Sequence, residues 1–410
     1  MSDDHYVFTP DDVYPRQRAL FDQFLADYKA LIKEQYDRRH EKWQRDFSSP
    51  EAYVASVEPN RARLRKALGG WHWEREELHL SREVVADFPK AGYRLERACY
   101  RIFTGIETDA LLLVPHSGGP HGDGPVAGVI CQVGVNGPPE RICGFDGTDN
   151  IYRRIGARLA AHGYVVLGTR MITGFAPDVT RDEDHRAPHL LTETQEEIRQ
   201  YIMQKYGKDE AKNWHEQSQS RNFIDKHCQL IGHRMMGTEM FALSRGVDLL
   251  AQLPEVDADR IGMYGLSQGG WSALHLPALD TRIQASACSA SFNERFRKIV
   301  EGTDGFRPST LYCAWFNIFD KLREFGDAEV ASLICPRAFF VEMGVGDDAV
   351  NYQTAVDEFN RVKAIYQQLG LGEKCDMVLH DGVHEVEPVE GDGPTTAMRF
   401  LDRWLKSEEA

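Results

Sequence analysis

The stretch that decides the fold is Arg260-Ile-Gly-Met-Tyr-Gly265-Leu266-Ser267-Gln268-Gly269-Gly270, which runs on into Trp271-Ser-Ala-Leu-His-Leu. It is a short apolar run that ends in Gly-x-Ser-x-Gly and leads straight into a helix-like segment. Strand, tight turn and helix in this order form a nucleophile elbow, which lifts a reactive serine above a sheet. A bare Gly-x-Ser-x-Gly more often marks a flexible turn, but the flanking segments favour the elbow. The strained turn needs small neighbours, and three glycines supply them around Ser267.

A serine hydroxyl is a weak nucleophile at neutral pH, so a base and an orienting acid must accompany Ser267. With this elbow the expected chain order is serine, acid, histidine. The run Cys335–Met343 predicts a buried strand, and an acid just beyond its carboxyl end would lie in the crevice of a parallel sheet. Asp347 is the predicted acid. Asp348 is the alternative, as a helix N-terminal residue that could exchange roles with it, whereas Glu342 is less suited because it lies inside the strand.

The predicted general base is His384. The segment Cys375-Asp-Met-Val-Leu-His380 alternates like a last strand, and His384 follows on the loop beyond it. The chain has 15 histidines, so position must select among them. His380 falls within the strand, whereas the loop of His384 can reach back over Ser267. Its imidazole would accept the serine proton and return it to the leaving group.

Two backbone N–H groups are needed to stabilise the oxyanion. One donor should be Gln268, the residue after the nucleophile. The other should lie on the loop after an early strand, and the segment Val126-Ala-Gly-Val-Ile-Cys-Gln-Val-Gly-Val135-Asn-Gly137 offers Val135. Taken alone, this segment is equally a glycine-rich turn without a catalytic part.

From about Tyr93 to Leu405 the chain resembles the α/β-hydrolase superfamily, and within it the branch of dienelactone hydrolases and acetyl xylan esterases. The resemblance implies a triad of Ser267, Asp347 and His384. It also implies cofactor-independent esterase chemistry on small acyl groups, or on esters of carbohydrates and other alcohols. Besides the elbow, the segments that carry the resemblance are Gly237-Thr-Glu-Met-Phe-Ala-Leu-Ser-Arg-Gly-Val-Asp-Leu-Leu, Pro254–Ile261, Ala278–Ile283 and Ile334–Arg337.

The chain departs from the family pattern in two places. Many relatives have a His-Gly pair at the early oxyanion loop, and here Val133 stands at the histidine position. A long insertion, residues 174–233, precedes the next sheet helix and is expected to cap the active site. Within it, Asp182-Glu-Asp184-His185-Arg-Ala-Pro-His189 invites a metal site, but Pro188 breaks any helical spacing and no metal-site motif is met. We expect a solvated loop there and no metal.

Composition limits the classes of partner. The chain has 410 residues, 42% hydrophobic and 10% aromatic, which suits a large globular core. Its formal net charge of -15 argues against nonspecific binding to nucleic acid. No apolar run approaches the roughly 20 residues that span a bilayer, and the acidic start Met1-Ser-Asp-Asp-His-Tyr lacks the pattern of a signal peptide. The eight cysteines are scattered without a Cys-x-x-Cys pair. These features favour core thiols and a cytoplasmic location.

Residues 1 to about 90 are predicted to form a helical extension. Leu20, Phe21, Phe24, Leu25, Tyr28, Leu31 and Ile32 recur at helical spacing. A second helix should begin at Ser49-Pro50-Glu51 and end near Gly69-Gly70. The apolar stripe is expected to pack on its own catalytic domain; a homodimer interface or a wall of the active site is the alternative.

The remainder, residues 91–410, is predicted to be an α/β domain. Segments 94–103 and 109–115 look like opening antiparallel strands, and strands then alternate with helices near 149–162, 237–253, 268–277, 352–369 and 394–406. This alternation predicts a mostly parallel sheet covered by helices on both faces.

The sequence thus predicts a serine hydrolase that cleaves carboxylic esters of small acyl groups through an acyl-enzyme. The same triad can cleave other bonds, so a carbon–carbon hydrolase for a diketone-like substrate is the alternative. A binding module without turnover is a third hypothesis, disfavoured by the intact set of Ser267, Asp347 and His384.

Overall fold

The computed structural model describes residues 10–69, 73–103, 105–116, 124–135, 137–171, 221–301, 318–391 and 393–406. The predicted insertion, residues 174–233, lies outside the described residues up to position 220. From there, residues 221–229 form a helix that leads towards the sheet helix α7. Whether the insertion caps the site stays a prediction.

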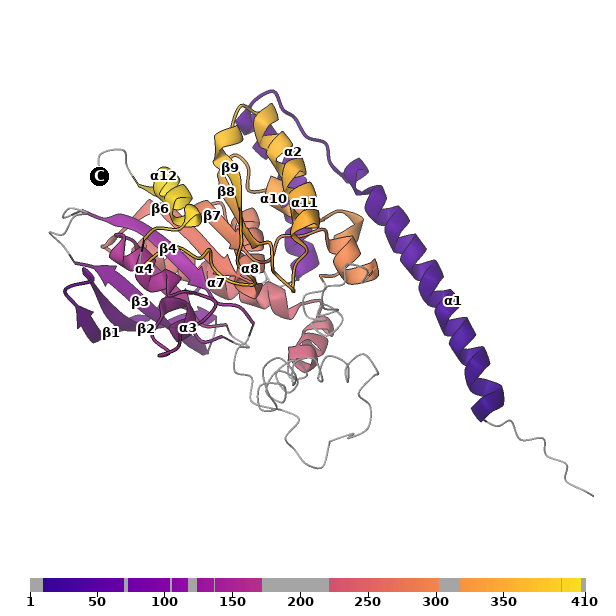
Figure 1. Cartoon of the computed structure of the whole chain (residues 1–410), viewed down its shortest axis with the longest axis horizontal. Helices are drawn as coiled ribbons and strands as arrows, with labels where there is room; N and C mark the ends of the chain where they lie inside the picture. The colour runs from indigo at the N-terminus through magenta and orange to yellow at the C-terminus, as the bar shows by residue number, and fades with distance from the viewer. Residues whose placement is uncertain are drawn as a thin grey trace, which may run out of the picture.

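A nine-stranded sheet organises the fold, in the order β1-β2-β3-β5-β4-β6-β7-β8-β9 (Figure 1). In this order, neighbouring strands pair antiparallel from β1 through β2 and β3 to β5. From β5 through β4 to β9, neighbouring strands pair parallel. The strands are β1 (Leu80–Phe88), β2 (Tyr93–Phe103), β3 (Ile106–Pro115), β4 (Val126–Gln132), β5 (Val165–Thr169), β6 (Val256–Leu266), β7 (Ile283–Ser289), β8 (Ala338–Gly344) and β9 (Cys375–His380).

Helices cover both faces of the sheet, as predicted. In β4 successive side chains alternate between two cores: Val129 and Cys131 enter one, and Ile130 enters the other. The first core contains residues of α3, α4 and α12, and the second contains residues of α2, α7, α8, α10 and α11. The helices are α1 (Pro10–Asp37), α2 (Pro50–Leu68), α3 (Pro139–Cys143), α4 (Ile155–Ala161), α7 (Met235–Gln252), α8 (Gln268–Leu279), α10 (Asp327–Ser332), α11 (Tyr352–Gln368) and α12 (Thr396–Leu405).

The prediction of helices up to about residue 90 was wrong for residues 80–88, which form β1 and pair antiparallel with β2. This edge strand is at most half-buried along its length. Its sequence, Leu-Ser-Arg-Glu-Val-Val-Ala-Asp-Phe, mixes charged and apolar residues without the continuous apolar run of the central strands. Pairing with β2, not burial, therefore decides its structure.

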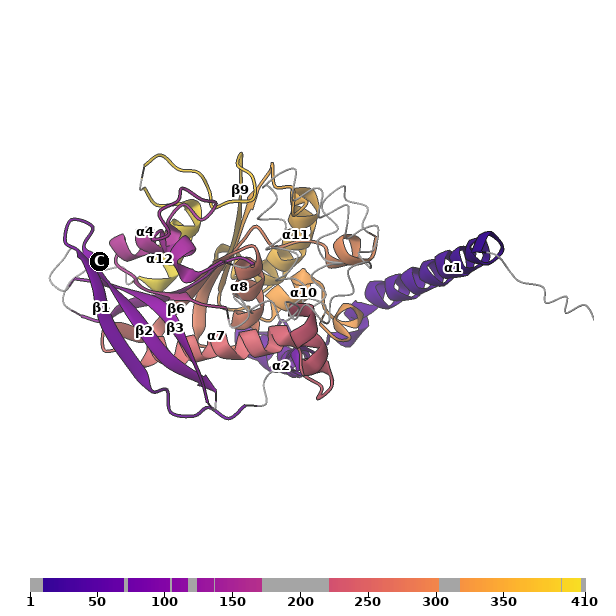
Figure 2. The ribbon, with the colours of Figure 1, turned by 90° about the horizontal axis from the view of Figure 1, so that it is seen from below.

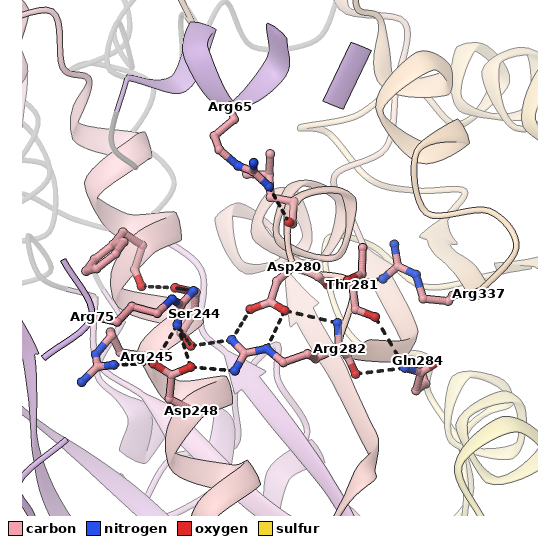
Figure 3. Close-up of polar contacts among 12 residues, drawn as sticks. Arg65, Arg75, Ser244, Arg245, Asp248, Asp280, Thr281, Arg282, Gln284 and Arg337 are labelled. Atoms are coloured by element: carbon pink, nitrogen blue, oxygen red, sulfur yellow. Dashed lines mark hydrogen bonds and ion pairs between the residues drawn. The ribbon is translucent and has the colours of Figure 1, made fainter. Parts of the chain in front are cut away.

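The second N-terminal helix has the predicted ends. Ser49 caps α2 by accepting a hydrogen bond from the Ala52 N–H, and Gly69 ends the helix in the left-handed conformation at φ 63°. One face of α2 is buried against the body of the molecule. From this face Arg61 donates to the carbonyl of Ala278 and Arg65 to the carbonyl of Leu279, at the end of α8. Figure 3 shows Arg65 at this end of the helix.

The first helix, α1, differs from α2 in that most of its length does not pack on the body of the molecule. Its last turn docks on the body, where Tyr36 is buried and stacks on Phe296 with ring centroids 5.5 Å apart. The preceding turns extend away from the rest of the molecule in both views (Figures 1 and 2). The expectation that the apolar stripe of α1 packs on its own domain was therefore wrong. No helix in the described part of the chain is long and apolar enough to cross a membrane.

Candidate active site

Ser267 occupies the sharp turn between β6 and α8, with φ 63° and ψ −117°. A positive φ is strained for a residue with a side chain and persists only where the surroundings impose it. Here the Ser267 N–H donates to the Ser289 carbonyl at the end of β7, and the Ser267 carbonyl accepts from the Trp271 N–H, both at 2.9 Å. The Gly-x-Ser-x-Gly sequence thus forms the strained strand-to-helix turn that it predicts.

Close packing of the backbone around this turn explains why two positions near it are glycine. A Cβ on Gly269 would collide with the Gln132 carbonyl at the end of β4. A Cβ on Gly134 would come within 3.1 Å of the Ser267 Cβ and 2.8 Å of the Tyr152 hydroxyl. The loop after β4 therefore lies directly against the serine.

Asp347 and His384 lie beyond the carboxyl ends of β8 and β9, and their side chains form a pair. The Asp347 Oδ2 lies 2.8 Å from the His384 Nδ1, and the carboxylate is buried. Its other oxygen accepts from the Ala349 and Val350 N–H groups at 2.7 and 3.2 Å. A carboxylate can only accept, so the Nδ1 of His384 donates this hydrogen bond and Nε2 takes no part in it. Of the two neighbouring acids, Asp347 is the one that contacts His384.

The loop that carries His384 returns across the sheet edge from β9 towards β4. The Val386 N–H donates to the Ile151 carbonyl at 2.9 Å, and Arg153 forms an ion pair with Glu385 at 2.6 Å. Residues 151–154 lie between β4 and α4. Three strands, β6, β7 and β8, separate β4 from β9 in the sheet.

Tyr152 joins this loop to the serine turn. Its hydroxyl accepts a hydrogen bond from the Gly134 N–H at 2.9 Å, and Gly134 lies against Ser267. A continuous path of contacts therefore leads from the His384 loop through residues 151–153 and Gly134 to Ser267. Within the described chain no hydrogen bond joins the Ser267 hydroxyl to His384. Such bonds often tighten only when substrate is bound. Sequence analysis missed Tyr152, and no local pattern marks it.

The two expected oxyanion donors lie on the two sides of this contact. Gln268 is the first residue of α8, whose initial N–H groups have no partner inside the helix. Val135 follows Gly134, whose own N–H is taken by Tyr152. Neither the Gln268 nor the Val135 N–H has an acceptor among the described residues. The Gln268 N–H also lies at the positive end of the α8 dipole.

Glu342, which was judged less suited than Asp347 to be the triad acid, makes other contacts in the structure. It is fully buried in β8, where its Oε1 accepts from the Tyr264 hydroxyl of β6, the Ser289 hydroxyl of β7 and the Glu387 N–H of the His384 loop, at 2.9–3.0 Å. Burial raises the pKa of Glu342 to about 7, and these three hydrogen bonds oppose the rise. Glu342 therefore connects three neighbouring strands to the His384 loop. The sequence signal for such a contact was a charged residue inside an otherwise apolar strand.

The acidic and histidine segment 182–189, for which a solvated loop was expected, lies outside the described residues. In the described part of the chain no group of three His, Cys, Asp or Glu side chains is arranged to hold a metal ion.

Two sequence comparisons bear on this site. The family of acetyl xylan esterases matches residues 202–333, a range that contains Ser267 and Gln268. The Bacillus subtilis (strain 168) protein YtaP, provisionally named a hydrolase, is 27% identical over 185 residues. That match covers 44% of this chain and 58% of YtaP, so it spans less than two thirds of the relative.

Solved structures share the fold over nearly the whole chain. A Bacteroides fragilis protein, provisionally named an acetyl xylan esterase, superposes with a TM-score of 0.59 at 15% identity, covering 93% of this chain and 91% of that one. A glucuronoyl esterase from Solibacter usitatus gives 0.54 at 14% identity, covering 83% and 90%. At these identities the likeness concerns the fold. Together, the comparisons show that the chain shares the fold of these esterases and that residues 202–333 are similar to the acetyl xylan esterase family.

Proposed function

We propose that the protein is a serine hydrolase that cleaves carboxylic esters of small acyl groups through an acyl-enzyme on Ser267. One observation carries the proposal: a strained Ser267 and a paired Asp347 and His384 lie at one edge of the sheet, joined through Tyr152 and Gly134. The family match over residues 202–333 supports the same chemistry.

In the proposed reaction His384 Nε2 accepts the Ser267 proton while the serine oxygen attacks the ester carbonyl carbon. The imidazolium then gives this proton to the leaving alcohol oxygen, and the acyl group stays on the serine. Water attacks the acyl-enzyme, again losing a proton to His384. The acid departs and the proton returns to Ser267. Asp347 fixes the Nδ1–H tautomer and stabilises the imidazolium throughout.

The negative charge on the carbonyl oxygen would be met by the Gln268 and Val135 N–H groups. Preorganised donors of this kind typically contribute on the order of 10²–10³ in rate each. No polar side chain stands at Val133 to orient the loop, and the hydrogen bond from Gly134 to Tyr152 supports it instead.

For the substrate we propose small acyl esters of carbohydrates. One structural relative is named for acetyl xylan, in which a small acyl group is esterified to a sugar hydroxyl, and another is named a glucuronoyl esterase, for esters of a sugar acid. The cleaved bond, however, is set by the pocket and not by the fold.

The test is hydrolysis of p-nitrophenyl esters of increasing acyl length by the wild type and by Ser267→Ala, followed by acetylated xylan oligosaccharides. Activity on the shortest chains should fall by about 10³-fold or more in the variant. Circular dichroism must show matched folding of the two proteins. Equal inactivity of both, with fluorophosphonate labelling of Ser267 intact, would turn attention to a carbon–carbon substrate, for which the products are an acid and a ketone. Absence of labelling as well would sink the catalytic proposal.

A further inference from the structure

The projecting part of α1 carries a continuous apolar stripe that the described residues leave exposed. Leu20, Phe24 and Tyr28 are 68%, 61% and 52% exposed, and the Phe24 and Tyr28 rings pack together with centroids 4.8 Å apart. At 3.6 residues per turn the stripe occupies an arc of about 140° on the helix. The stripe consists of Leu20, Phe21, Phe24, Leu25, Tyr28 and Leu31.

A helix with such a face needs a partner. Helices are marginal in water on their own, and in proteins their stability comes mostly from packing the apolar face. In the part of the chain that the structure describes, α1 obtains this packing at its C-terminal end, where Tyr36 stacks on Phe296. Scattered exposed apolar residues are ordinary, but a contiguous patch marks an interaction site.

We propose that this stripe is the interface of a homodimer, in which α1 pairs antiparallel with α1 of a second copy across a two-fold axis. The inference is independent of the proposed reaction, because it uses no residue of the active site. A two-fold interface buries the same patch on both copies, so one self-complementary stripe supplies both sides.

The area of the stripe suits a dimer. Side chains of this size present roughly 200 Å² each when fully exposed, so the stripe together with Tyr14, which is 64% exposed, offers on the order of 700 Å². A stable interface of standard size needs about 800 Å² from each partner. The aromatic rings at its centre, Phe21, Phe24 and Tyr28, are residue types enriched in such interfaces.

The shape of the molecule favours the antiparallel arrangement. Each body lies at the C-terminal end of its α1 (Figures 1 and 2). A helix of 28 residues is about 42 Å long. Antiparallel pairing therefore places the two bodies at opposite ends of the helix pair, whereas parallel pairing would bring them to the same end.

Charge argues against a membrane surface as the occupant. Amphipathic helices that bind anionic lipid carry mainly Lys and Arg on the polar face. From Pro10 to Asp37 the helix has six acidic and four basic residues, and the whole chain has a net charge of -15. The stripe thus lacks the electrostatic attraction that such binding uses.

The test is the mass of the full-length protein in solution, by light scattering after size exclusion or by sedimentation, from about 1 to 100 µM. The expected mass is twice the 46.6 kDa of one chain. The double variant Phe24→Glu with Tyr28→Glu should be monomeric over this range, because it places charges at the centre of the stripe.

A matched control keeps the test interpretable. Ala26→Glu with Ala30→Glu adds the same charges at the same spacing on the opposite face of α1, and should remain dimeric. Circular dichroism and ester hydrolysis report folding of the body in every variant. A monomeric wild type at 100 µM overturns the proposal, as does a dimer that survives Phe24→Glu with Tyr28→Glu. Stripe-dependent sedimentation of a monomeric wild type with anionic vesicles would assign the face to a membrane instead.

Discussion

The two ends of α8 differ in how their backbone groups are satisfied. At the N-terminal end Ser267 is strained, no side chain caps the helix, and the Gln268 N–H has no acceptor in the described chain. At the C-terminal end all of the last four carbonyls, those of residues 276–279, accept hydrogen bonds. Their donors are the Asp280 N–H, Arg337, Arg61 and Arg65 respectively.

This asymmetry separates function from stability along one helix. The last four carbonyls of a helix have no partner within it, and arginines at this end also match the negative end of the helix dipole. Figure 3 shows how densely charged this end is: Asp248 and Asp280 both bind Arg282, and Asp248 also binds Arg75. The opposite end has no side-chain cap, and under the proposed function its N–H donors and positive potential would serve the oxyanion. The C-terminal end of α8 is thus fixed by side chains, whereas the N-terminal end is the one that the proposal assigns to catalysis.

The largest expected effect is at the N-terminal end of α8. Asp347→Asn should lower kcat for a short p-nitrophenyl ester by on the order of 10³–10⁴, because the amide can stabilise the wrong tautomer of His384. The matched control is Asp348→Asn, which should change kcat by less than about threefold since the hydrogen bond to the His384 Nδ1 is made by Asp347. Initial rates of the three proteins decide the point. A large loss in the Asp348 variant with a small one in the Asp347 variant would exchange the two roles.

At the C-terminal end of α8 the expected loss is of stability and not of activity. Arg61 is 2% exposed and donates to the Ala278 and Leu333 carbonyls. Arg61→Ala leaves these acceptors buried and should lower the free energy of unfolding by about 2–4 kcal/mol, with kcat of the folded protein retained. Urea unfolding measures this. Arg323→Ala removes an exposed ion pair with Asp320 and should cost at most about 1 kcal/mol. If both variants lost the same free energy of unfolding, the hydrogen bonds to the α8 carbonyls would contribute no more stability than an exposed ion pair does.

Glu342 connects Ser289, beside the N-terminal end of α8, to the His384 loop, and it should make stability depend on pH. Its pKa is about 7 in the folded protein against an ordinary value of 4.5, so the folded chain binds more protons between these values. The free energy of unfolding therefore falls as pH rises from about 4.5 to about 7 through this group, and changes little outside that window. Glu342→Gln should flatten this fall. Urea midpoints at several pH values test it, and an unchanged slope in the variant would contradict the assignment.

The sequence predicted those features whose cause is local. The elbow follows from the glycines around Ser267, and the acid and the base follow from their positions just past strand ends. Long-range contacts had no such signal: Tyr152 meets Gly134 only after folding, and Arg61 reaches a carbonyl 217 residues away. The stripe of α1 was recognised as an apolar face, but a periodic pattern does not say what covers it. Strand β1 was missed because pairing, and not burial, holds it.

The smallest effect concerns the support of the oxyanion loop. Tyr152→Phe leaves the Gly134 N–H without its acceptor and should loosen the loop that presents Val135. We expect kcat to fall by about 3- to 10-fold with KM nearly unchanged, because the oxyanion donor acts in the transition state and not in the bound ground state. Tyr164→Phe is the matched control, since it also removes a hydroxyl from a buried tyrosine ring, but one bonded to Asp402 on α12. It should cost similar stability and leave kcat intact. If both variants lose only stability, the Gly134–Tyr152 bond supports the fold alone, and the N-terminal end of α8 positions its substrate without help from this loop.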